Sequence, residues 1–211
     1  MAYDLEEQEK LDSVKAWWQK NGGWITSVLL VVMLALAGWN GWNWWQRKQA
    51  TDAALLYEQV QKAVEARDAE RIKRSAADMQ EKYGKTAYGE MTALLAARAL
   101  YDAGDLATAK SHLKWATEHA KRDEYRVLAR VRLAGVLLDE KAYDEGLALL
   151  KDKPPAAFAG VVADRRGDLY AAQGKAAEAR TAYREALEAA GKDQGTARQL
   201  IQFKLDALGD A

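Results

Sequence analysis

The sequence predicts an all-α protein in which one N-terminal transmembrane helix precedes a solenoid of helical hairpins. Three observations support this fold class. The 211-residue chain has only two prolines, and alanine is abundant from residue 50 onward, which favours helices over strands. A run of 22 residues, Trp24–Trp45, carries no charge. From residue 87 the chain repeats a pattern of small and large apolar residues.

The overall composition narrows the classes of function. Lys plus Arg and Asp plus Glu each number 31, so no global positive field indicates a nucleic-acid partner. The chain has no cysteine, which excludes disulfides, thiolate metal sites and cysteine nucleophiles. This absence fits a reducing cytosol and an oxidising periplasm equally well. The length suits one domain with an appendage.

The uncharged run, WITSVLLVVMLALAGWNGWNWW, follows a short leader of residues 1–23 and is the predicted transmembrane helix, 24–45. A helix of that length spans roughly 33 Å, close to the hydrocarbon thickness of a bilayer. Tryptophan gathers at both ends of the run, as it does at the two interfaces of a membrane. The predicted interface residues are Trp17, Trp18 and Trp24 on one side and Trp39, Trp42, Trp44 and Trp45 on the other.

Two alternatives compete with a retained anchor. A cleaved signal peptide would use the small residues of 35–37, but the preceding segment is acidic (Asp4, Glu6, Glu7, Glu9 and Asp12), where a signal needs a basic start. A buried core helix seldom runs so far without a charge. The retained single-span anchor is therefore the expectation, with the lipid bilayer as its surroundings.

The orientation of the span does not follow from charge. Lys10, Lys15 and Lys20 precede it, and three basic residues follow it within a comparable distance. The positive-inside count is a tie. A short tail inside and a large domain outside is a common arrangement, but the residues alone leave the direction open.

Residues 46–86 predict juxtamembrane amphipathic helices. One apolar stripe joins Ala53, Leu56, Tyr57, Val60 and Val64, and a second joins Ala69, Ile72, Ala76, Met79 and Tyr83. The pair 67–68, Arg-Asp, is the expected break between the two helices, the first of which continues the span or packs beside it.

Residues 87–211 predict repeats close to the 34-residue tetratricopeptide period, with offsets of 37 and 33 residues. Three stretches align in register. Their small residues in the first helix are Ala97, Ala134 and Gly167, their turns are Gly104, Lys141 and Gly174, their small residues in the second helix are Ala109, Gly146 and Ala179, and the large residues that follow are Leu113, Leu150 and Tyr183.

These positions have a physical reason. Small residues let the two helices of a hairpin approach closely, and large ones fill the space between hairpins. A single hairpin cannot cover its apolar face, so neighbours must stack. The last helix, around 197–208, is expected to cap the stack with Leu200, Ile201, Phe203, Leu205 and Leu208.

The residues predict no catalytic, metal or cofactor site. His112 and His119 lie seven residues apart, about 10 Å on a helix, which is too far to share a metal ion, and are expected to be polar surface residues. Asp164 and Asp168 are spaced i, i+4, but two neighbouring arginines indicate a solvated helix face. The glycines lack the strand–loop–helix setting of a phosphate-binding loop.

A solenoid offers a groove along the first helices of its hairpins, and this groove is the predicted partner site. Its candidate residues are Met91, Leu94, Arg98 and Tyr101, then Leu128, Val131 and Leu138, then Val161, Asp164 and Asp168. This set is apolar with few charges, so we expect it to take an apolar or helical segment of another protein. The alternative, equally supported by the pattern, is that these side chains only complete the core.

The same stretches carry a family resemblance. A single span after a short acidic leader, then YGKTAYGEMTALLAARALYDAGDLATAKSHLKWA, LARVRLAGVLLDEKAYDEGLALL and RRGDLYAAQGKAAEARTAYREAL, and KLDAL near the end, resembles the YfgM family over nearly the whole chain. These are ancillary subunits of the bacterial SecYEG translocon. The density of tryptophan around the span is a departure from the family pattern.

The resemblance implies a non-enzymatic inner-membrane protein with a cytoplasmic N-terminus and a periplasmic repeat domain. It implies partners in SecYEG, in a PpiD-like membrane-anchored periplasmic chaperone, and in secreted client proteins that pass from the channel to periplasmic chaperones. The alternative from the residues is a periplasmic scaffold for envelope assembly or cell division that uses the same repeats on another partner.

Overall fold

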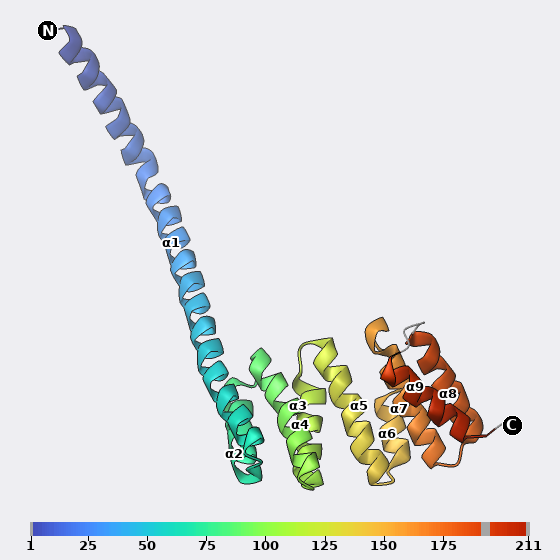
Figure 1. The fold of residues 1–211 in the computed structure, drawn as a ribbon. Coiled ribbons are helices and arrows are strands. Elements are labelled where there is room, and N and C mark those ends of the chain that lie inside the picture. The colour runs from blue at the N-terminus through green and yellow to red at the C-terminus, as the bar shows by residue number, and fades with distance from the viewer. Residues whose placement is uncertain (1, 191–194, 210–211) are drawn as a thin grey trace. The chain divides into compact units, whose positions relative to one another are not determined.

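The computed structural model describes residues 2–190 and 195–209, with side chains from Glu9 onward, so the first acids of the leader (Asp4 to Glu7) lie outside the described side chains. In those residues the chain forms nine α-helices, one short 3-10 helix and no strand (Figure 1). The prediction of an all-α protein is confirmed. The elements are α1 Ala2–Glu65, α2 Ala69–Tyr83, α3 Ala87–Asp102, α4 Leu106–His119, α5 Asp123–Asp139, α6 Tyr143–Leu149, η1 Ala156–Phe158, α7 Ala159–Ala172, α8 Ala176–Ala189 and α9 Thr196–Ala207.

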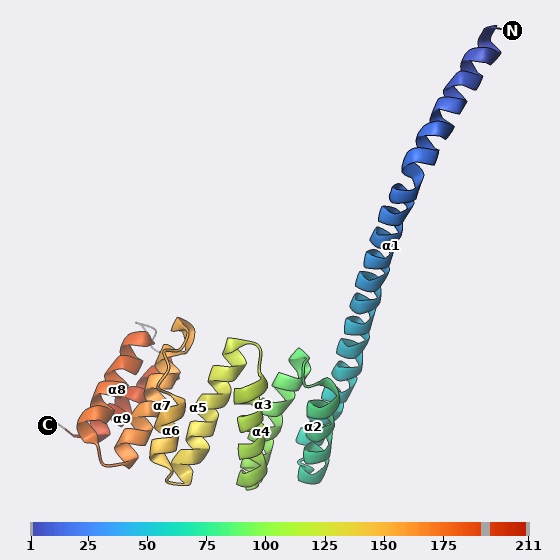
Figure 2. The same ribbon diagram turned by 180° about the vertical axis from the view of Figure 1, so that it is seen from behind.

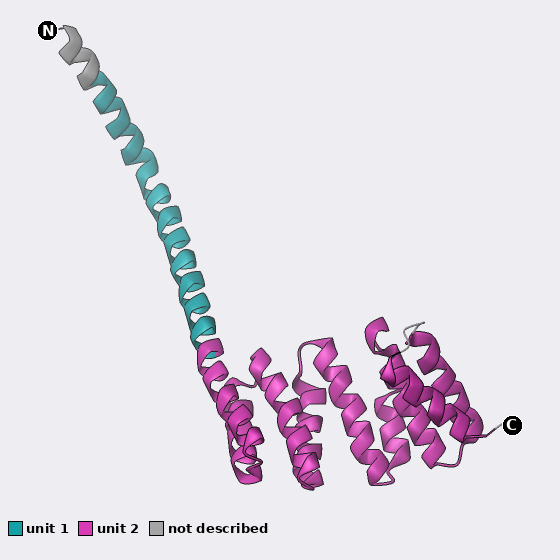
Figure 3. Ribbon diagram, viewed as in Figure 1, with its two compact units in different colours: residues 1–49 teal, residues 50–211 magenta. Residues whose placement is uncertain are grey.

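The chain divides into two compact units, residues 1–49 and 50–211, and the division falls inside α1 (Figure 3). In the first unit, α1 exposes its apolar side chains. From Val28 to Leu36 the large aliphatic side chains are 47–65% exposed, which a helix in a soluble core would bury. Within the described residues, α1 is the one helix long and apolar enough to cross a membrane.

The second unit is built from helical hairpins that follow one another side by side in chain order (Figures 1 and 2). Residues 50–65 pair with α2, α3 with α4, α5 with α6, and α7 with α8, before α9 ends the array. The last three pairs are the three repeats that the sequence pattern predicts. The structure adds a fourth of the same form, made from the residues predicted to be juxtamembrane helices.

Each hairpin turns through one residue with a positive φ angle. These residues are Arg67 (53°), Gly104 (84°), Lys141 (60°) and Gly174 (75°). They recur at intervals of 37, 37 and 33 residues, and the next helix begins two residues later. Asp68 and Asp105 then cap α2 and α4, because their carboxylates accept the backbone N–H of the residue three positions on. The predicted break at Arg67-Asp68 is confirmed.

The small and large residues of the repeats meet in the core as predicted. Ala97 and Leu113 share one cluster, and Ala134 and Leu150 share another. In the last hairpin the ring of buried Tyr183 lies against the backbone of Gly167: a Cβ there would stand 2.4 Å from Tyr183 Cε1. The contact between small and large residues therefore fixes how closely the two helices of each hairpin approach.

The final helix covers the end of the array with one face only. Ile201 is buried against the α7–α8 cluster, and Leu205 and Leu208 pack beside it. Leu200 and Phe203, which were expected in the same cap, are 54% and 70% exposed. They lie outside the face that Ile201 buries, so these two residues do not contribute to the cap.

Candidate membrane segment and partner groove

The seven tryptophans of the predicted membrane interface lie in the first unit and are all 46–68% exposed. The rings of Trp42 and Trp45 contact each other at 5.3 Å between centroids, and Lys48 Nζ lies 5.6 Å from the centre of the Trp44 ring. A cation beside indole rings is typical of a helix leaving hydrocarbon for the headgroup region.

The polar side chains at the start of the apolar segment bond to the helix itself. Thr26 Oγ1 donates to the Gly22 carbonyl at 2.7 Å, and Ser27 Oγ donates to the Gly23 carbonyl at 2.9 Å. Such back-bonding satisfies hydroxyl groups where no water is present. This segment of α1 is therefore chemically compatible with a bilayer along its apolar length.

In the second unit, a pocket of about 230 Å³ lies between the first helices of three successive hairpins. The α3 helix contributes Arg98 and Tyr101, α5 contributes Arg132, Gly135 and Asp139, and α7 contributes Arg165, while the remaining lining residues are Ala97, Leu113 and Val136. The predicted groove along the first helices therefore contains a pocket, with two of the predicted residues, Arg98 and Tyr101, in its wall.

The other predicted groove residues lie elsewhere. Leu94 and Val131 are 5% and 3% exposed and belong to the core, so these two predictions are corrected. Leu128 and Leu138 are half-buried and pack against the same clusters. Met91 is half-buried and Val161 is exposed, but neither lines the pocket.

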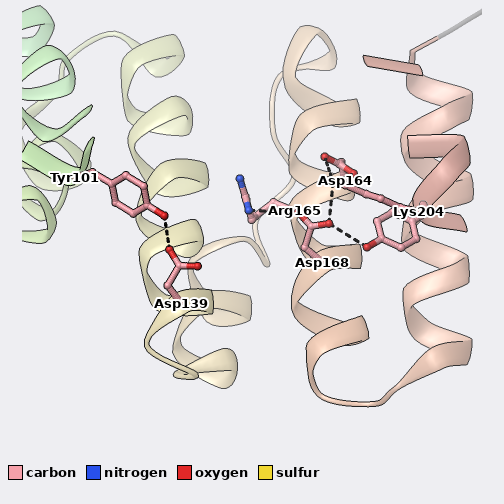
Figure 4. Close-up of polar contacts among 7 residues, drawn as sticks. Tyr101, Asp139, Asp164, Arg165, Asp168 and Lys204 are labelled. Carbon is pink, nitrogen blue, oxygen red and sulfur yellow. Dashed lines mark hydrogen bonds and ion pairs between the residues drawn. The ribbon is translucent and has the colours of Figure 1, made fainter. Parts of the chain in front are cut away.

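The wall of the pocket is polar, which corrects the expectation of an apolar groove. Arg98 pairs with Asp102 at 2.7 Å, and Tyr101 donates its hydroxyl to Asp139 at 2.6 Å (Figure 4). The bond to Asp139 raises the pKa of Tyr101, because it stabilises the protonated hydroxyl. On α5 the lining positions differ by one residue from those predicted, and one residue is a rotation of about 100° around the helix.

Arg132 has a different environment from Arg98. It is half-buried, and its guanidinium donates to the carbonyl of Leu94 at 3.1 Å. Burial lowers the pKa of Arg132, and the charge of Arg98 lowers it further. Both effects mean that the positive charge of Arg132 is poorly stabilised where it stands.

The two predicted carboxylates on α7 form a network with α9. Lys204 Nζ lies 2.8 Å from oxygens of both Asp164 and Asp168 (Figure 4). Tyr183 donates its hydroxyl to Asp168 at 3.0 Å, and Arg165 pairs with Asp168 at 3.3 Å. Burial raises the pKa of Asp164. The expectation of a solvated face is corrected here, and no sequence pattern pointed to Lys204.

The two histidines have separate structural contacts. His112 is 6% exposed, which corrects its expected place on the surface, and its Nδ1 lies 2.9 Å from Gln80 Nε2. The ring of His119 stacks on Trp115 at 5.0 Å. Across residues 9–190 and 195–209, no group of three or more His, Cys, Asp or Glu side chains is placed to hold a metal ion.

A solved structure described as "MamA RS-1 ArsTM double mutant" shares the fold, with a TM-score of 0.53 at 17% identity. The match covers 74% of this chain and 93% of that one. A family model described as "Tetratricopeptide repeat-like domain" matches residues 15–210. The predicted tetratricopeptide-like solenoid is thereby confirmed.

Full-length relatives carry one common name. A protein of Neisseria gonorrhoeae named "Ancillary SecYEG translocon subunit" is 36% identical over 99% of this chain and 100% of its own. Proteins with the same name from Aggregatibacter actinomycetemcomitans (30%, over 99% and 100%) and Escherichia coli (27%, over 96% and 96%) also align. The chain therefore belongs to the family of ancillary SecYEG translocon subunits.

Proposed function

We propose that this chain is a non-enzymatic, membrane-anchored interaction subunit of the Sec translocon. The observation that carries the proposal is the alignment with relatives of that name along the entire chain, from the apolar helix to the last repeat. In this proposal residues 24–45 cross the bacterial inner membrane once, residues 1–23 stay in the cytoplasm, and the repeats work in the periplasm.

The role of the anchor is to raise the local concentration of the repeats near the channel. A tethered module meets its partner as an intramolecular event, with an effective concentration that reaches the millimolar range for a short link. The exposed apolar surface between Val28 and Leu36 and the flanking tryptophans support this assignment. A bilayer-embedded anchor of this kind needs no specific contact with the channel to be effective.

The role of the repeats is to hold partner polypeptides. The expected partners are SecYEG, a PpiD-like membrane-anchored chaperone, and secreted proteins on their way from the channel to periplasmic chaperones. A polar pocket between three first helices supports a protein-binding role, since such helices line the binding surface of a solenoid.

Co-purification from membranes in mild detergent tests the tethering role. Full-length protein is expected to retain SecYEG and the chaperone. A variant in which an unrelated single span replaces residues 24–45 is expected to retain part of this association, whereas a fragment that lacks residues 1–48 is expected to lose most of it. Full retention of SecYEG by the unanchored fragment would contradict the role of the anchor.

The orientation has a direct test, because the chain lacks cysteine. Single cysteines replace two exposed serines, Ser13 in the leader and Ser111 on α4. A membrane-impermeant maleimide applied to cells with a permeable outer membrane is expected to label Ser111→Cys and to spare Ser13→Cys until the inner membrane is opened. The reverse pattern would refute the proposed direction.

In vivo crosslinking separates this function from an envelope scaffold. A photoreactive amino acid at Tyr101, which is 38% exposed beside the pocket, reports what the repeats touch. Adducts with translocon subunits, the chaperone or secreted proteins support the proposal. Adducts confined to envelope-assembly or division proteins would replace it with the scaffold.

A further inference from the structure

The pocket between α3, α5 and α7 contains more positive charge than its own carboxylate balances. Its wall holds three guanidinium groups, from Arg98, Arg132 and Arg165, and one carboxylate, from Asp139. The charges of Arg98 and Arg165 both act on Tyr101, and that of Arg98 acts on Arg132, so the three side chains share one electrostatic environment. An anion that enters this pocket meets three donors of the same sign.

Arg132 is the side chain with the most to gain from an added anion. Among the described residues it forms no ion pair, and the partner of its guanidinium is the backbone carbonyl of Leu94. A half-buried cation without a counter-charge is costly, because burial removes water and a neutral carbonyl replaces only part of that stabilisation. A carboxylate would supply the missing charge through short, charge-assisted hydrogen bonds.

Arg165 reaches the same space from the opposite wall. Its side chain extends from α7 toward the Tyr101–Asp139 pair on the α5 side (Figure 4). One end of the guanidinium pairs with Asp168, while Nε is buried without a hydrogen-bond partner in the described structure. Gly135 leaves room for it: a Cβ at that position would lie 3.4 Å from Arg165 Cζ.

Size and charge define the ligand group. The volume of about 230 Å³ is below the range of roughly 300–1,000 Å³ for pockets that enclose a whole small ligand, so the pocket fits one side chain or chain end. Asp139 in the wall repels a doubly charged phosphate more strongly than a singly charged carboxylate. A protein-binding module supplies the rest of the ligand as polypeptide.

We propose that this pocket binds a carboxylate of a partner polypeptide, with Arg132 as its main donor and Arg98 and Arg165 on either side. The proposal deepens the partner-binding role proposed above and rests on it. It replaces the apolar groove expected from the sequence with a site of defined chemistry.

Fluorescence anisotropy of labelled peptides on the purified full-length protein in mild detergent tests this site. The probes are short peptides of alanine, leucine and serine in three matched forms: an internal glutamate with an amidated end, glutamine with an amidated end, and glutamine with a free carboxyl end. Binding of the first or the third form above the second supports the proposal, and the stronger of the two shows whether the carboxylate comes from a side chain or a chain end. Equal binding of all three forms would overturn it.

Three variants locate the binding. Arg132→Gln is expected to weaken the carboxylate peptide by about ten-fold to a hundred-fold, as loss of a charged hydrogen bond does. Arg184→Gln removes the same charge from an exposed position on α8 outside the pocket and is expected to bind as the native protein does. Gly135→Ala keeps every charge and narrows the pocket beside Arg165, and it is expected to weaken binding without loss of fold.

The outcomes distinguish a defined site from a general attraction between opposite charges. If Arg184→Gln weakens the peptide as much as Arg132→Gln, the attraction is a general charge effect and the site is refuted. Unchanged binding by both Arg132→Gln and Gly135→Ala would refute it equally. Circular dichroism of each variant checks its fold. Because this assay uses no translocon, its failure contradicts only the carboxylate site, whereas loss of SecYEG co-purification contradicts the proposed function.

Discussion

Replacement of Gly167 by alanine is expected to disrupt the last hairpin. The new Cβ would stand 2.4 Å from Cε1 and 2.5 Å from Cδ1 of Tyr183, whereas carbon atoms in contact normally lie about 3.5–4.0 Å apart. The ring cannot easily move away: Tyr183 is 3% exposed, and its hydroxyl is bonded to Asp168 at 3.0 Å. Relief of the clash requires a shift of about 1 Å in a rigid, buried aromatic ring.

The expected cost follows from three effects. An overpacked methyl group in a core costs about 1–3 kcal/mol, and a weakened Tyr183–Asp168 hydrogen bond adds about 1 kcal/mol. The higher helix propensity of alanine returns about 0.5–1 kcal/mol. The net loss of stability in the last hairpin is therefore about 1–3 kcal/mol. The matched control is Gly135→Ala in α5, where the Cβ meets only the guanidinium of Arg165 at 3.4 Å, so helix propensity dominates and the hairpin gains about 0.5–1 kcal/mol.

Hydrogen exchange measured by mass spectrometry on the full-length protein resolves the two variants. Amides of α7 and α8 are expected to exchange about five-fold to a hundred-fold faster in Gly167→Ala, since each 1.4 kcal/mol is about a factor of ten. Amides of α3 serve as an internal reference, because a defect in a repeat array acts mainly on its neighbours. If both alanines slow exchange in their own hairpins, the fit of Tyr183 against Gly167 does not set the helix spacing.

Three further predictions concern buried or capping groups. Glu90, 3% exposed, accepts the Arg122 guanidinium and the Lys121 amide, so Glu90→Ala should cost about 1–3 kcal/mol, seen as faster exchange in α3 and α5; unchanged exchange would contradict this. Burial lowers the pKa of His112, so its contribution is complete above its ordinary pKa of 6.5 and falls as pH drops below that value; His112→Gln should flatten this pH dependence of stability. Asp105→Ala removes the cap of α4 and should cost about 0.5–2 kcal/mol. Because the Asp105 pKa is about 2, against an ordinary 3.8, its contribution is lost in acid titrations between those values; stability that is flat there would refute the pairing.

The repeats were predictable because their spacing is local. Turns with a positive φ angle recur at a fixed interval, and glycine marks two of them, Gly104 and Gly174. The first hairpin was predicted only as two helices, because its turn residue is Arg67 and its first helix is the tail of a far longer one. Periodicity alone does not show that such a tail belongs to the repeat array.

The groove was harder to predict than the fold. Helix α5 carries apolar residues on most of its sides, so its pattern does not select the face that lines the pocket, and the prediction differed by one residue. The contact of Lys204 with Asp164 joins residues 40 apart. No local signal in a sequence announces such a pair, because it depends on where the last helix packs.

The position of the pocket within the array affects how long it persists. Open ends of a one-dimensional array fray first, whereas its interior opens only when both neighbouring interfaces are lost. Arg132, Gly135 and Asp139 lie on α5, with a hairpin on each side of its own. Local opening of α9 at the terminus would therefore leave these three residues in place. The carboxylate site is thus built into the kinetically most protected part of the repeat array, so its geometry should outlast fluctuations at either end.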